Sequence, residues 1–507
     1  MKKKAVFLAL LASITALCAC TGGRTEEKGS EDLVSAVVGI TQDLDSLDPH
    51  KAVAAGTDEV LFNVFEGLVK PSADGTLVPA VAKEYAIAPD GMSYTFTLRE
   101  NVKFHNGEVV TADDVVYSVK RCAGLLDNKD PEVVVESALS VISAVEKVGE
   151  DTIVLKLSEP NTELLGFLTC AIIPEEYSEQ GSAPVGTGPY KFVSYTPLNS
   201  FVVERFEEYY GEKPYLEKVT FKICASNDAA FMELLSGSID IFPYLTDEQA
   251  AQLTDEYNLE VGSTNVVQAM FLNNDFGPFA DLKVRQALCY AVDKEELLNI
   301  VGGGRGHVIG SNMFPNFGVY YDETLENYYT YQPEKAKELL KEAGYDESNP
   351  LTFTVKVPSN YDIHVATSQV LAEQYKKVGV QAEIQLIEWS AWLTDVYRSR
   401  DYEATIVALD SALAPSDVLK RYVSTAKNNF VNYESAKFDE VFANALASTV
   451  DSEKVALYKE TQKLLTEDAA SVYLQDGAKL VAVNKKFTNF LFYPVYVLDL
   501  AAIKAAE

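Results

Sequence analysis

The sequence lacks most of the motifs by which enzymes are recognised. Its 507 residues include only four histidines, at positions 50, 105, 307 and 364. None of them stands in the HExxH or HxxEH spacing of zinc peptidases, and no GxSxG sequence marks a serine nucleophile. Carboxylates are abundant, but no pair is set apart by its spacing as the acid and base of a glycosidase. We therefore predict that the protein is not an enzyme and carries no cofactor.

Positive charge is also scarce. The chain has 43 Lys and Arg against 75 Asp and Glu, a formal net charge of −32. Nucleic-acid binding needs clustered cations that neutralise phosphates, so this composition argues against a nucleic-acid partner. An acidic surface keeps a protein soluble and favours cationic ligands. Hydrophobic residues make up 47% of the chain, which is ample for large cores, and the length predicts about three domains.

Cysteines are few and scattered. After the first 20 residues only Cys122, Cys170, Cys224 and Cys289 remain, with no CxxC pair and no metal-ligand spacing. An exported protein can form disulfides, whereas buried free thiols behave as small apolar side chains. We favour free thiols, but both alternatives stay open. Cys122 with Cys170 is the pair to examine first, because both fall in one predicted subdomain.

One apolar run is of the kind that membrane-targeting segments have, and it lies at the N-terminus. Lys2–Lys4 precede the apolar stretch Ala5–Leu17, the pattern of a signal peptide that is too short for a comfortable transmembrane helix. The following Cys18-Ala19-Cys20 resembles the end of a bacterial lipobox. Residues 1–19 then form the signal peptide, Cys20 is the site of lipid attachment, and residues 20–34 are a polar tether. The alternative is an ordinary signal peptide with incidental cysteines.

Two glycine-rich runs and one acidic run lack the residues that would make them ligand sites. The acids of Asp43–Pro49 have neither the turn glycine nor the closing glutamate of an EF-hand. No Lys-Ser/Thr pair follows Pro184–Tyr190 at P-loop spacing. Gly302–Gly306 follows a predicted helix, where glycine is expected as a C-terminal cap. We therefore predict no metal site and no nucleotide site.

Local patterns predict strands and helices in alternation. Residues 94–98 alternate apolar and polar, as a half-buried strand does, and Thr111 with Asp114 forms a capping box at the start of a helix. Residues 57–68 and 133–148 are predicted as helices. Strand 351–357, helix 363–378 and strand 381–387 make a β-α-β unit, which predicts parallel strands.

Several of these runs together resemble one family. They are Glu66-Gly67-Leu68, residues 94–99 (YTFTLR), 102–107 (VKFHNG) and 111–121, then Gly186–Tyr190 (GTGPY), Tyr209–Leu216 and Val284–Lys294. They are similar to the extracellular solute-binding proteins of family 5, the oligopeptide, dipeptide and nickel class that feeds ABC importers. The similarity extends from about Asp43 to Phe490. It implies an α/β, two-lobed periplasmic-binding-protein-like fold with an extra N-terminal subdomain, mixed sheets flanked by helices, and a hinge between the lobes.

The resemblance also implies an organisation and a role. Lobe I comprises residues 35–60, 186–264 and 485–507, the extra subdomain residues 61–185, and lobe II residues 265–484. The protein is expected outside the cytoplasm, held by its lipid anchor at the cell surface or in the periplasm. As a monomer it would capture an oligo- or dipeptide in the cleft between the lobes and deliver it to a membrane permease and ATPase complex. Some relatives carry nickel chelates, haem or sugars, and a surface receptor or adhesin with the same fold is a further alternative.

In peptide-binding members the ligand is an extended chain held by backbone hydrogen bonds, with its α-ammonium on an aspartate that follows a lobe II strand. Asp410 occupies that position and Ala408 lies on the preceding strand; the alternative is that Asp410 closes the next loop. Val53 and Ala54 lie where the family runs an exposed backbone edge along the cleft. Trp389 matches a tryptophan that lines the cleft, with core packing as the alternative.

The remaining correspondences are less direct. Asn428 matches a polar residue that reaches the peptide backbone. Val407 stands where the family has an aromatic residue, and Pro415 comes one residue late, so residues 407–415 are expected to set specificity. Arg285 is either a ligand clamp or an internal salt bridge, and we favour the salt bridge. His105 and Arg121 are predicted to be structural.

Overall fold

The computed structural model describes residues 34–128 and 130–506, and these residues form one compact unit. Cys20 and the predicted signal peptide and tether therefore lie outside the described residues, apart from residue 34. The mixed α/β class is confirmed, since a twelve-stranded sheet with parallel and antiparallel neighbours carries helices on its faces. Among the described residues no helix is long and apolar enough to cross a membrane.

The strands are β1 (Ser35–Ile40), β2 (Val69–Pro71), β3 (Leu77–Pro79), β4 (Ala82–Ile87), β5 (Ser93–Leu98), β6 (Ile142–Val148), β7 (Thr152–Leu157), β8 (Tyr190–Thr196), β9 (Ser200–Arg205), β10 (Lys218–Ile223), β11 (Ile241–Phe242), β12 (Tyr257–Ser263), β13 (Val267–Leu272), β14 (Gly306–Val308), β15 (Thr352–Pro358), β16 (Gln381–Ile387), β17 (Ala404–Leu409), β18 (Ser471–Asn484), β19 (Phe487–Thr488) and β20 (Lys504–Ala505).

The α-helices are α1 (Ala55–Leu61), α2 (Ala112–Cys122), α3 (Asn227–Leu235), α4 (Asp247–Ala250), α5 (Leu282–Tyr290), α6 (Lys294–Val301), α7 (Pro333–Glu342), α8 (Asp362–Lys376), α9 (Trp389–Ala391), α10 (Pro415–Leu419), α11 (Ala436–Ala447) and α12 (Asp451–Glu467). A π-helical turn follows at Trp392–Arg398. The 3₁₀ turns are η1 (Ser137–Val141), η2 (Leu164–Phe167), η3 (Gly277–Ala280), η4 (Pro315–Tyr320), η5 (Glu323–Leu325) and η7 (Lys420–Tyr422).

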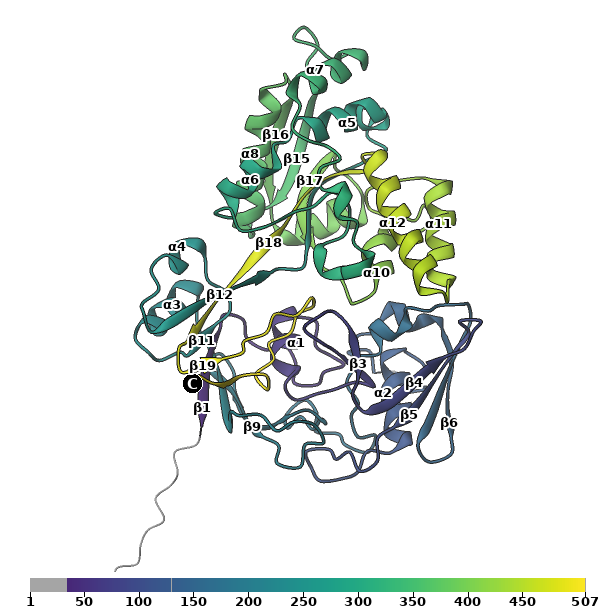
Figure 1. The fold of residues 1–507 in the computed structure, drawn as a ribbon, viewed down its shortest axis with the longest axis vertical. Helices are drawn as coiled ribbons and strands as arrows, with labels where there is room; N and C mark the ends of the chain where they lie inside the picture. The colour runs from purple at the N-terminus through teal and green to yellow at the C-terminus, as the bar shows by residue number, and fades with distance from the viewer. Residues whose placement is uncertain (1–33, 129, 507) are drawn as a thin grey trace, which may run out of the picture. The chain divides into compact units, whose positions relative to one another are not determined.

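Strand β18 connects two groups of strands that each have their own core (Figure 1). Strands β1 and β8–β12, with the helices packed on them, are called lobe I here, and strands β13–β17 with their helices are called lobe II. The first residues of β18, Ser471–Gln475, pair with β13 of lobe II, and its last seven, Ala478–Asn484, pair with β12 of lobe I. The chain crosses in the other direction between β12 and β13, so two adjacent connections join the lobes.

Lobe II contains the predicted β-α-β unit. Strands β15 and β16 are parallel over their whole length, with Val355 opposite Ile384, and α8 lies between them in sequence. This prediction is confirmed, with the helix running from Asp362 to Lys376. The apolar side chains of the unit, among them Phe353 and Leu371, are buried in the core of lobe II.

A separate four-stranded sheet, in the order β4-β5-β7-β6, packs against α2 and forms the extra subdomain (lower right in Figure 1). Its strand β5 buries Tyr94, Phe96 and Leu98, as the alternation predicted. Helix α2 begins with the predicted capping box: the Thr111 hydroxyl oxygen accepts the Asp114 N–H, and the Asp114 carboxylate accepts the Thr111 N–H.

We expect Thr111→Ala to lower the free energy of unfolding by about 1 kcal/mol, because it removes the acceptor for one helix N-terminal N–H group. Urea unfolding followed by circular dichroism measures the change. Thr76→Ala, on an exposed turn of the same region, is the control and should change the free energy by about 0.5 kcal/mol or less. Equal losses for the two variants would contradict the role of the cap.

One predicted helix is wrong, and another is shorter than predicted. Residues 133–148 form η1 followed by strand β6, because β6 pairs along its length with β7 and adds an edge to the subdomain sheet. The helix predicted over 57–68 covers only Ala55–Leu61 and is preceded by Ala54, so Thr57 does not cap it. The chain turns after Leu61, where the Asn63 amide bonds to the carbonyls of Val60 and Leu498.

Polar residues that the sequence offers as ligand candidates serve the fold instead. Arg121 makes two hydrogen bonds to the Asp48 carboxylate at 2.9 and 2.7 Å, and His105 Nε2 lies 3.0 Å from the Gly188 carbonyl oxygen. Both are therefore structural, as predicted. Arg285 lines neither of the cavities described below, and it makes no salt bridge with any residue in 34–128 or 130–506, contrary to the prediction. It donates to the backbone carbonyls of Asp468 and Phe279 and ties the start of α5 to the end of α12.

Candidate functional site

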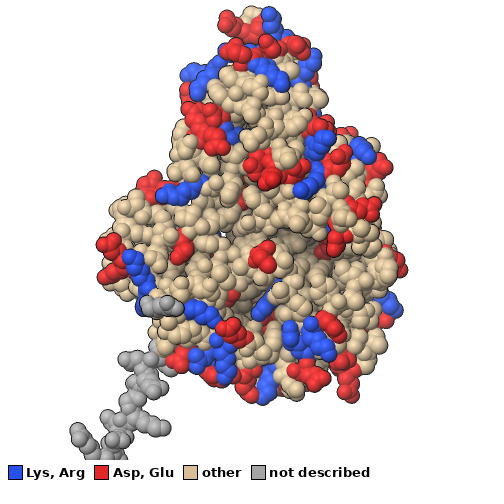
Figure 2. Space-filling view, viewed as in Figure 1, with Lys and Arg blue, Asp and Glu red and all other residues tan. Residues whose placement is uncertain are grey.

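Two adjoining cavities lie between lobe I, the extra subdomain and lobe II. The first has a volume of about 530 Å³ and the second about 700 Å³. Both are lined by Val495, Tyr496 and Val497, so they form one continuous cleft along the C-terminal segment. Figure 2 shows that charged side chains crowd the periphery of this face, whereas the band between the lobes is mostly uncharged. Both volumes are in the range of small-molecule sites.

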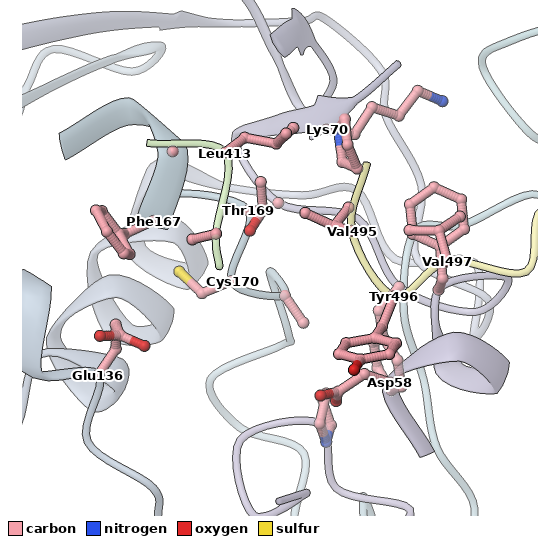
Figure 3. A pocket seen from close by; sticks show the side chains of 18 of the residues that line it. Asp58, Lys70, Glu136, Phe167, Thr169, Cys170, Leu413, Val495, Tyr496 and Val497 are labelled. Atoms are coloured by element: carbon pink, nitrogen blue, oxygen red, sulfur yellow. The ribbon is translucent and has the colours of Figure 1, made fainter. Parts of the chain in front are cut away.

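The walls of the first cavity come from segments far apart in the sequence. They are residues of α1 and the turn after it, the β2 strand, the 166–171 loop of the extra subdomain, the 410–413 loop of lobe II, and the C-terminal segment at 495–497. Figure 3 shows Cys170, Thr169 and Phe167 on one side of this cavity and Tyr496 with Asp58 on the other. A ligand here would contact both lobes at once.

Most acids along the cleft already have partners. Glu66 accepts from Lys70 at 2.7 Å and from the hydroxyls of Tyr209 and Tyr210 at 2.7 and 2.6 Å. Asp417 pairs with Lys420 at 2.7 Å, and it also accepts the Ala412 N–H, so it shapes the loop. In the second cavity Glu59 pairs with Lys479 at 2.7 Å.

Asp410 and Asp58 are the exceptions. Both line the first cavity and both are exposed, and within residues 34–128 and 130–506 neither carboxylate has a recorded hydrogen bond or ion pair. Tyr496 lies close to Asp58 in Figure 3, and burial, followed by the negative charges of Asp410 and Glu59, raises the pKa of the Tyr496 hydroxyl. The carboxylates therefore bring two unneutralised negative charges to the cavity.

Desolvation by the cavity wall raises the pKa of Asp58 to about 6, with the negative charges of Asp45 and Glu59 adding to the effect. Asp45 itself accepts the Thr57 hydroxyl at 2.6 Å and the Val53 N–H at 2.8 Å. A positive charge bound beside Asp58 would stabilise its ionised form and lower its pKa.

The second cavity has a neutral polar floor under strand β17. The Ala408 N–H donates to His364 Nε2 at 3.2 Å, and His364 Nδ1 lies 2.9 Å from the Gln268 side-chain amide. The Gln475 side-chain amide in turn donates to the Gln268 side-chain oxygen at 2.8 Å. Burial lowers the pKa of His364 to about 4, so the ring is uncharged at neutral pH. Since its N–H is taken, Ala408 has only its carbonyl oxygen to offer a ligand.

An aromatic wall stands beside this floor. Trp389 lines the cavity and stacks on Trp392 at 4.9 Å with 3° between the rings, and Tyr361 meets it edge-on at 5.5 Å. Trp392 is buried, and its indole N–H donates to Thr405 at 2.8 Å. Trp389 is 36% exposed, so it is the outer ring of a stack anchored in the core of lobe II.

The other predicted ligand residues are more dispersed. Val53 is exposed and donates its N–H to Asp45, and Ala54 precedes α1; neither lines either cavity, although Ala52 and Ala55 on each side of them do. Asn428 is half-buried in the loop after η7 and also lies outside both cavities.

Sequence reasoning missed residues that the fold brings to the cleft. Asp58 reads as an ordinary acid in the first turn of a helix, and Tyr361, His364 and Gln475 carry no motif. Tyr496 belongs to the C-terminal segment and carries no motif either. Only the close approach of four distant segments shows that these side chains share one cleft. No group of three His, Cys, Asp or Glu among the described residues is placed to hold a metal ion.

Known proteins share the sequence and the fold. Residues 76–430 match the bacterial extracellular solute-binding proteins, family 5. The chain is 28% identical to the glutathione-binding protein GsiB of Pectobacterium atrosepticum, over 90% of this chain and 92% of that one. It is 27% identical to the dipeptide-binding protein of Escherichia coli, over 83% and 84%. The crystal structure of the ABC transporter substrate-binding protein CtaP of Listeria monocytogenes matches with a TM-score of 0.83 and 26% identity, over 93% and 99%.

These matches confirm the two-lobed binding-protein fold and the prediction that the protein is not an enzyme. They also assign it to the extracytoplasmic side of the membrane, where proteins of this family work. The chain belongs to the bacterial extracellular solute-binding proteins of family 5, and is a substrate-binding protein of an ABC importer.

Proposed function

We propose that the protein binds a short peptide with a free amino terminus in the cleft and carries it to the permease. The observation that carries the proposal is Asp410, a carboxylate exposed to the cleft with no partner recorded within residues 34–128 and 130–506, while Glu66, Asp417 and Glu59 nearby are paired. An α-ammonium group would supply the missing partner through a charge-assisted hydrogen bond. Two relatives, a glutathione-binding protein and a dipeptide-binding protein, support a peptide ligand.

Other contacts would be independent of the peptide's sequence. The Ala408 carbonyl oxygen can accept one peptide N–H, and Trp389 offers an apolar surface to a side chain. Val53 and Ala54 lie just outside the cavities and would reach the peptide backbone only if the lobes close further. Asn428 would likewise need a rearrangement of its loop. Contacts to the peptide backbone do not distinguish side chains, and the Trp389 ring can accept any apolar side chain, so broad specificity is favoured.

Closure would take place about the two connections between the lobes. Asn265, between β12 and β13, has a φ of 59° and donates to the Tyr493 carbonyl oxygen at 2.7 Å. Strand β18 passes from lobe II to lobe I beside this connection, since it pairs with β13 and then with β12. We assign the hinge to Asn265 and the middle of β18. The expected lobe boundary at residues 264–265 fits this hinge, whereas the one at 484–485 lies at the far end of β18, after the residues that pair with β12 of lobe I. A closed, liganded form is what a permease could distinguish from the open one.

Attachment to the membrane would be through Cys20. In this proposal a lipid on that cysteine and the following polar tether hold a monomeric binding protein beside its permease. Mass spectrometry of the protein extracted from membranes should find a lipid-modified N-terminal Cys20, and Cys20→Ala should release the protein into the soluble fraction. An unmodified N-terminus at any other residue would exclude the anchor.

The peptide proposal is tested by calorimetric titration of the purified protein. The probes are trialanine, N-acetyl-trialanine, haem and a nickel–histidine chelate. Binding of trialanine that is at least about 10-fold tighter than binding of its acetylated form is expected. Binding of haem or the nickel chelate with no binding of either peptide would overturn the proposal.

The raised pKa of Asp58 predicts that ligand affinity depends on pH. Its pKa of about 6 lies above the ordinary 3.8, so the folded, unliganded protein holds the proton more tightly than the unfolded chain, and Asp58 ionises as the pH rises through 6. Because a nearby ligand cation favours the ionised carboxylate, affinity for trialanine should rise between pH 5 and pH 7. Asp58→Asn should flatten the profile, and Asp228→Asn, outside both cavities, should leave it unchanged. A wild-type affinity independent of pH would contradict this role.

A further inference from the structure

Two cysteines meet at the wall of the first cavity. Cys122 is the last residue of α2, and Cys170 lies in the loop after η2. Both line the cavity, Cys122 is buried and Cys170 is half-buried. Their side chains lie within hydrogen-bonding reach of each other, and this contact, with burial, raises the pKa of the Cys122 thiol well above its ordinary value. Figure 3 shows the Cys170 side chain beside Phe167 on this wall.

We propose that Cys122 and Cys170 are a covalent modification site, which reacts with a small-molecule disulfide such as oxidised glutathione to form an intramolecular disulfide bond. The protein works outside the cytoplasm, where thiols are not kept reduced. The half-buried Cys170 is the thiol that a reagent in the cavity can reach. The buried Cys122 lines the same cavity and its thiol interacts with that of Cys170, so it is the second thiol of the pair.

The intramolecular disulfide forms through two successive thiol–disulfide exchanges. The Cys170 thiolate attacks one sulfur of the reagent, its S–S bond breaks, and one reagent thiol leaves while a mixed disulfide forms on Cys170. The Cys122 thiolate then attacks the Cys170 sulfur and displaces the second reagent thiol. The protein gives up two protons and two electrons, and the reagent disulfide is reduced to two thiols. The high pKa of Cys122 makes the second exchange the slower one at neutral pH.

The bond would fix a loop that lobe II touches. The 163–171 segment approaches the 410–416 loop closely: a Cβ added at Gly166 would lie 2.9 Å from the Leu413 carbonyl oxygen, and the Glu163 carboxylate accepts the Ser416 N–H at 2.9 Å. A Cys122–Cys170 bond would therefore fix this loop, which forms one wall of the cavity and contacts lobe II, to helix α2 within the extra subdomain.

The other two cysteines provide an internal contrast. Cys224 is buried in the small core of lobe I and its thiol faces the Lys222 carbonyl oxygen at 3.8 Å. Cys289 is buried in the core of lobe II, with the Ser471 carbonyl oxygen 4.0 Å from its sulfur. Neither has a recorded contact with a second thiol in the described part of the chain. Only the Cys122–Cys170 pair should be oxidised.

The test is peptide mapping of the purified protein after incubation with oxidised glutathione and alkylation of the remaining thiols. We expect one cross-linked peptide pair containing Cys122 and Cys170, with Cys224 and Cys289 alkylated. The melting temperature should rise by about 4 °C, because the bond closes a loop of roughly 50 residues in the unfolded chain, and dithiothreitol should reverse the rise.

Two variants complete the experiment. In Cys122→Ser the second exchange is impossible, so glutathione should remain attached to Cys170 and the melting temperature should not rise. Cys224→Ser is the matched control and should form the same cross-link as the wild type. Full alkylation of Cys122 and Cys170 in the treated wild type, or stable glutathione on wild-type Cys170 without the cross-link, would overturn the proposal even if a variant fails to fold.

Discussion

Arg121→Ala is expected to lower the free energy of unfolding by about 3–5 kcal/mol, because it leaves the Asp48 carboxylate buried without its cation. Asp48 is 5% exposed and receives two hydrogen bonds from Arg121 and one from the His50 N–H at 3.0 Å. This pair connects the extra subdomain to the turn that precedes α1. Denaturant unfolding followed by fluorescence and circular dichroism measures the loss.

Two comparisons separate the buried pair from a surface effect. Lys147→Ala breaks an exposed pair with Asp113 in the same subdomain and should cost about 1 kcal/mol or less. The double variant Asp48→Leu with Arg121→Met should be more stable than Arg121→Ala, since no lone charge is left buried. A loss in Arg121→Ala no larger than that in Lys147→Ala would contradict the account.

The Asp48–Arg121 pair should also make the free energy of unfolding depend on pH. Burial alone would raise the pKa of Asp48, but the Arg121 guanidinium and the His50 N–H outweigh it and hold the pKa below the ordinary 3.8. A lowered carboxyl pKa stabilises the folded state above the unfolded pKa, and the stabilisation is lost as the pH falls below about 4. The unfolding free energy of the wild type should therefore fall relative to that of the double variant as the pH is lowered below about 4.

Asp410→Asn is expected to weaken binding of trialanine by about 10- to 150-fold, the cost of a charge-assisted hydrogen bond of roughly 1.5–3 kcal/mol. The amide keeps the size of the side chain but loses its charge. Because Asp410 is exposed and has no recorded partner in the described part of the chain, the substitution should leave the fold and the melting temperature of the unliganded protein unchanged.

N-acetyl-trialanine is the control ligand, and its weak binding should be the same for the wild type and Asp410→Asn. Asp401→Asn is the control variant, since that side chain is exposed on lobe II and lines neither cavity. An unchanged affinity of Asp410→Asn for trialanine would show that Asp410 does not hold the amine.

The sequence predicted the parts of the fold that are determined locally or by close family similarity. The capping box at Thr111 and the β-α-β unit from β15 to β16 are built from neighbouring residues, and both were predicted correctly. Strand β6 was not, because an edge strand of this kind is decided by its partner β7 rather than by its own period. Arg285 was assigned a salt bridge because a charged side chain does not reveal that backbone carbonyls will be its partners.

The cleft was predictable only where the family similarity names a residue. Asp410 and Trp389 were found in this way, and both line the cleft. The similarity could not show that the His364 ring occupies the Ala408 N–H, or that Asp58 of α1 brings a second carboxylate to the cavity of Asp410. Those features depend on the meeting of segments more than 40 residues apart, which has no local sequence pattern.

The most direct test of the central claim is to identify what the protein carries when it is purified from cells. Native mass spectrometry of the purified protein, followed by sequencing of the released ligand, requires no choice of probe. We predict a set of short peptides with unmodified amino termini and varied side chains. Release of a non-peptide solute, or of peptides whose amino termini are all blocked, would contradict the account.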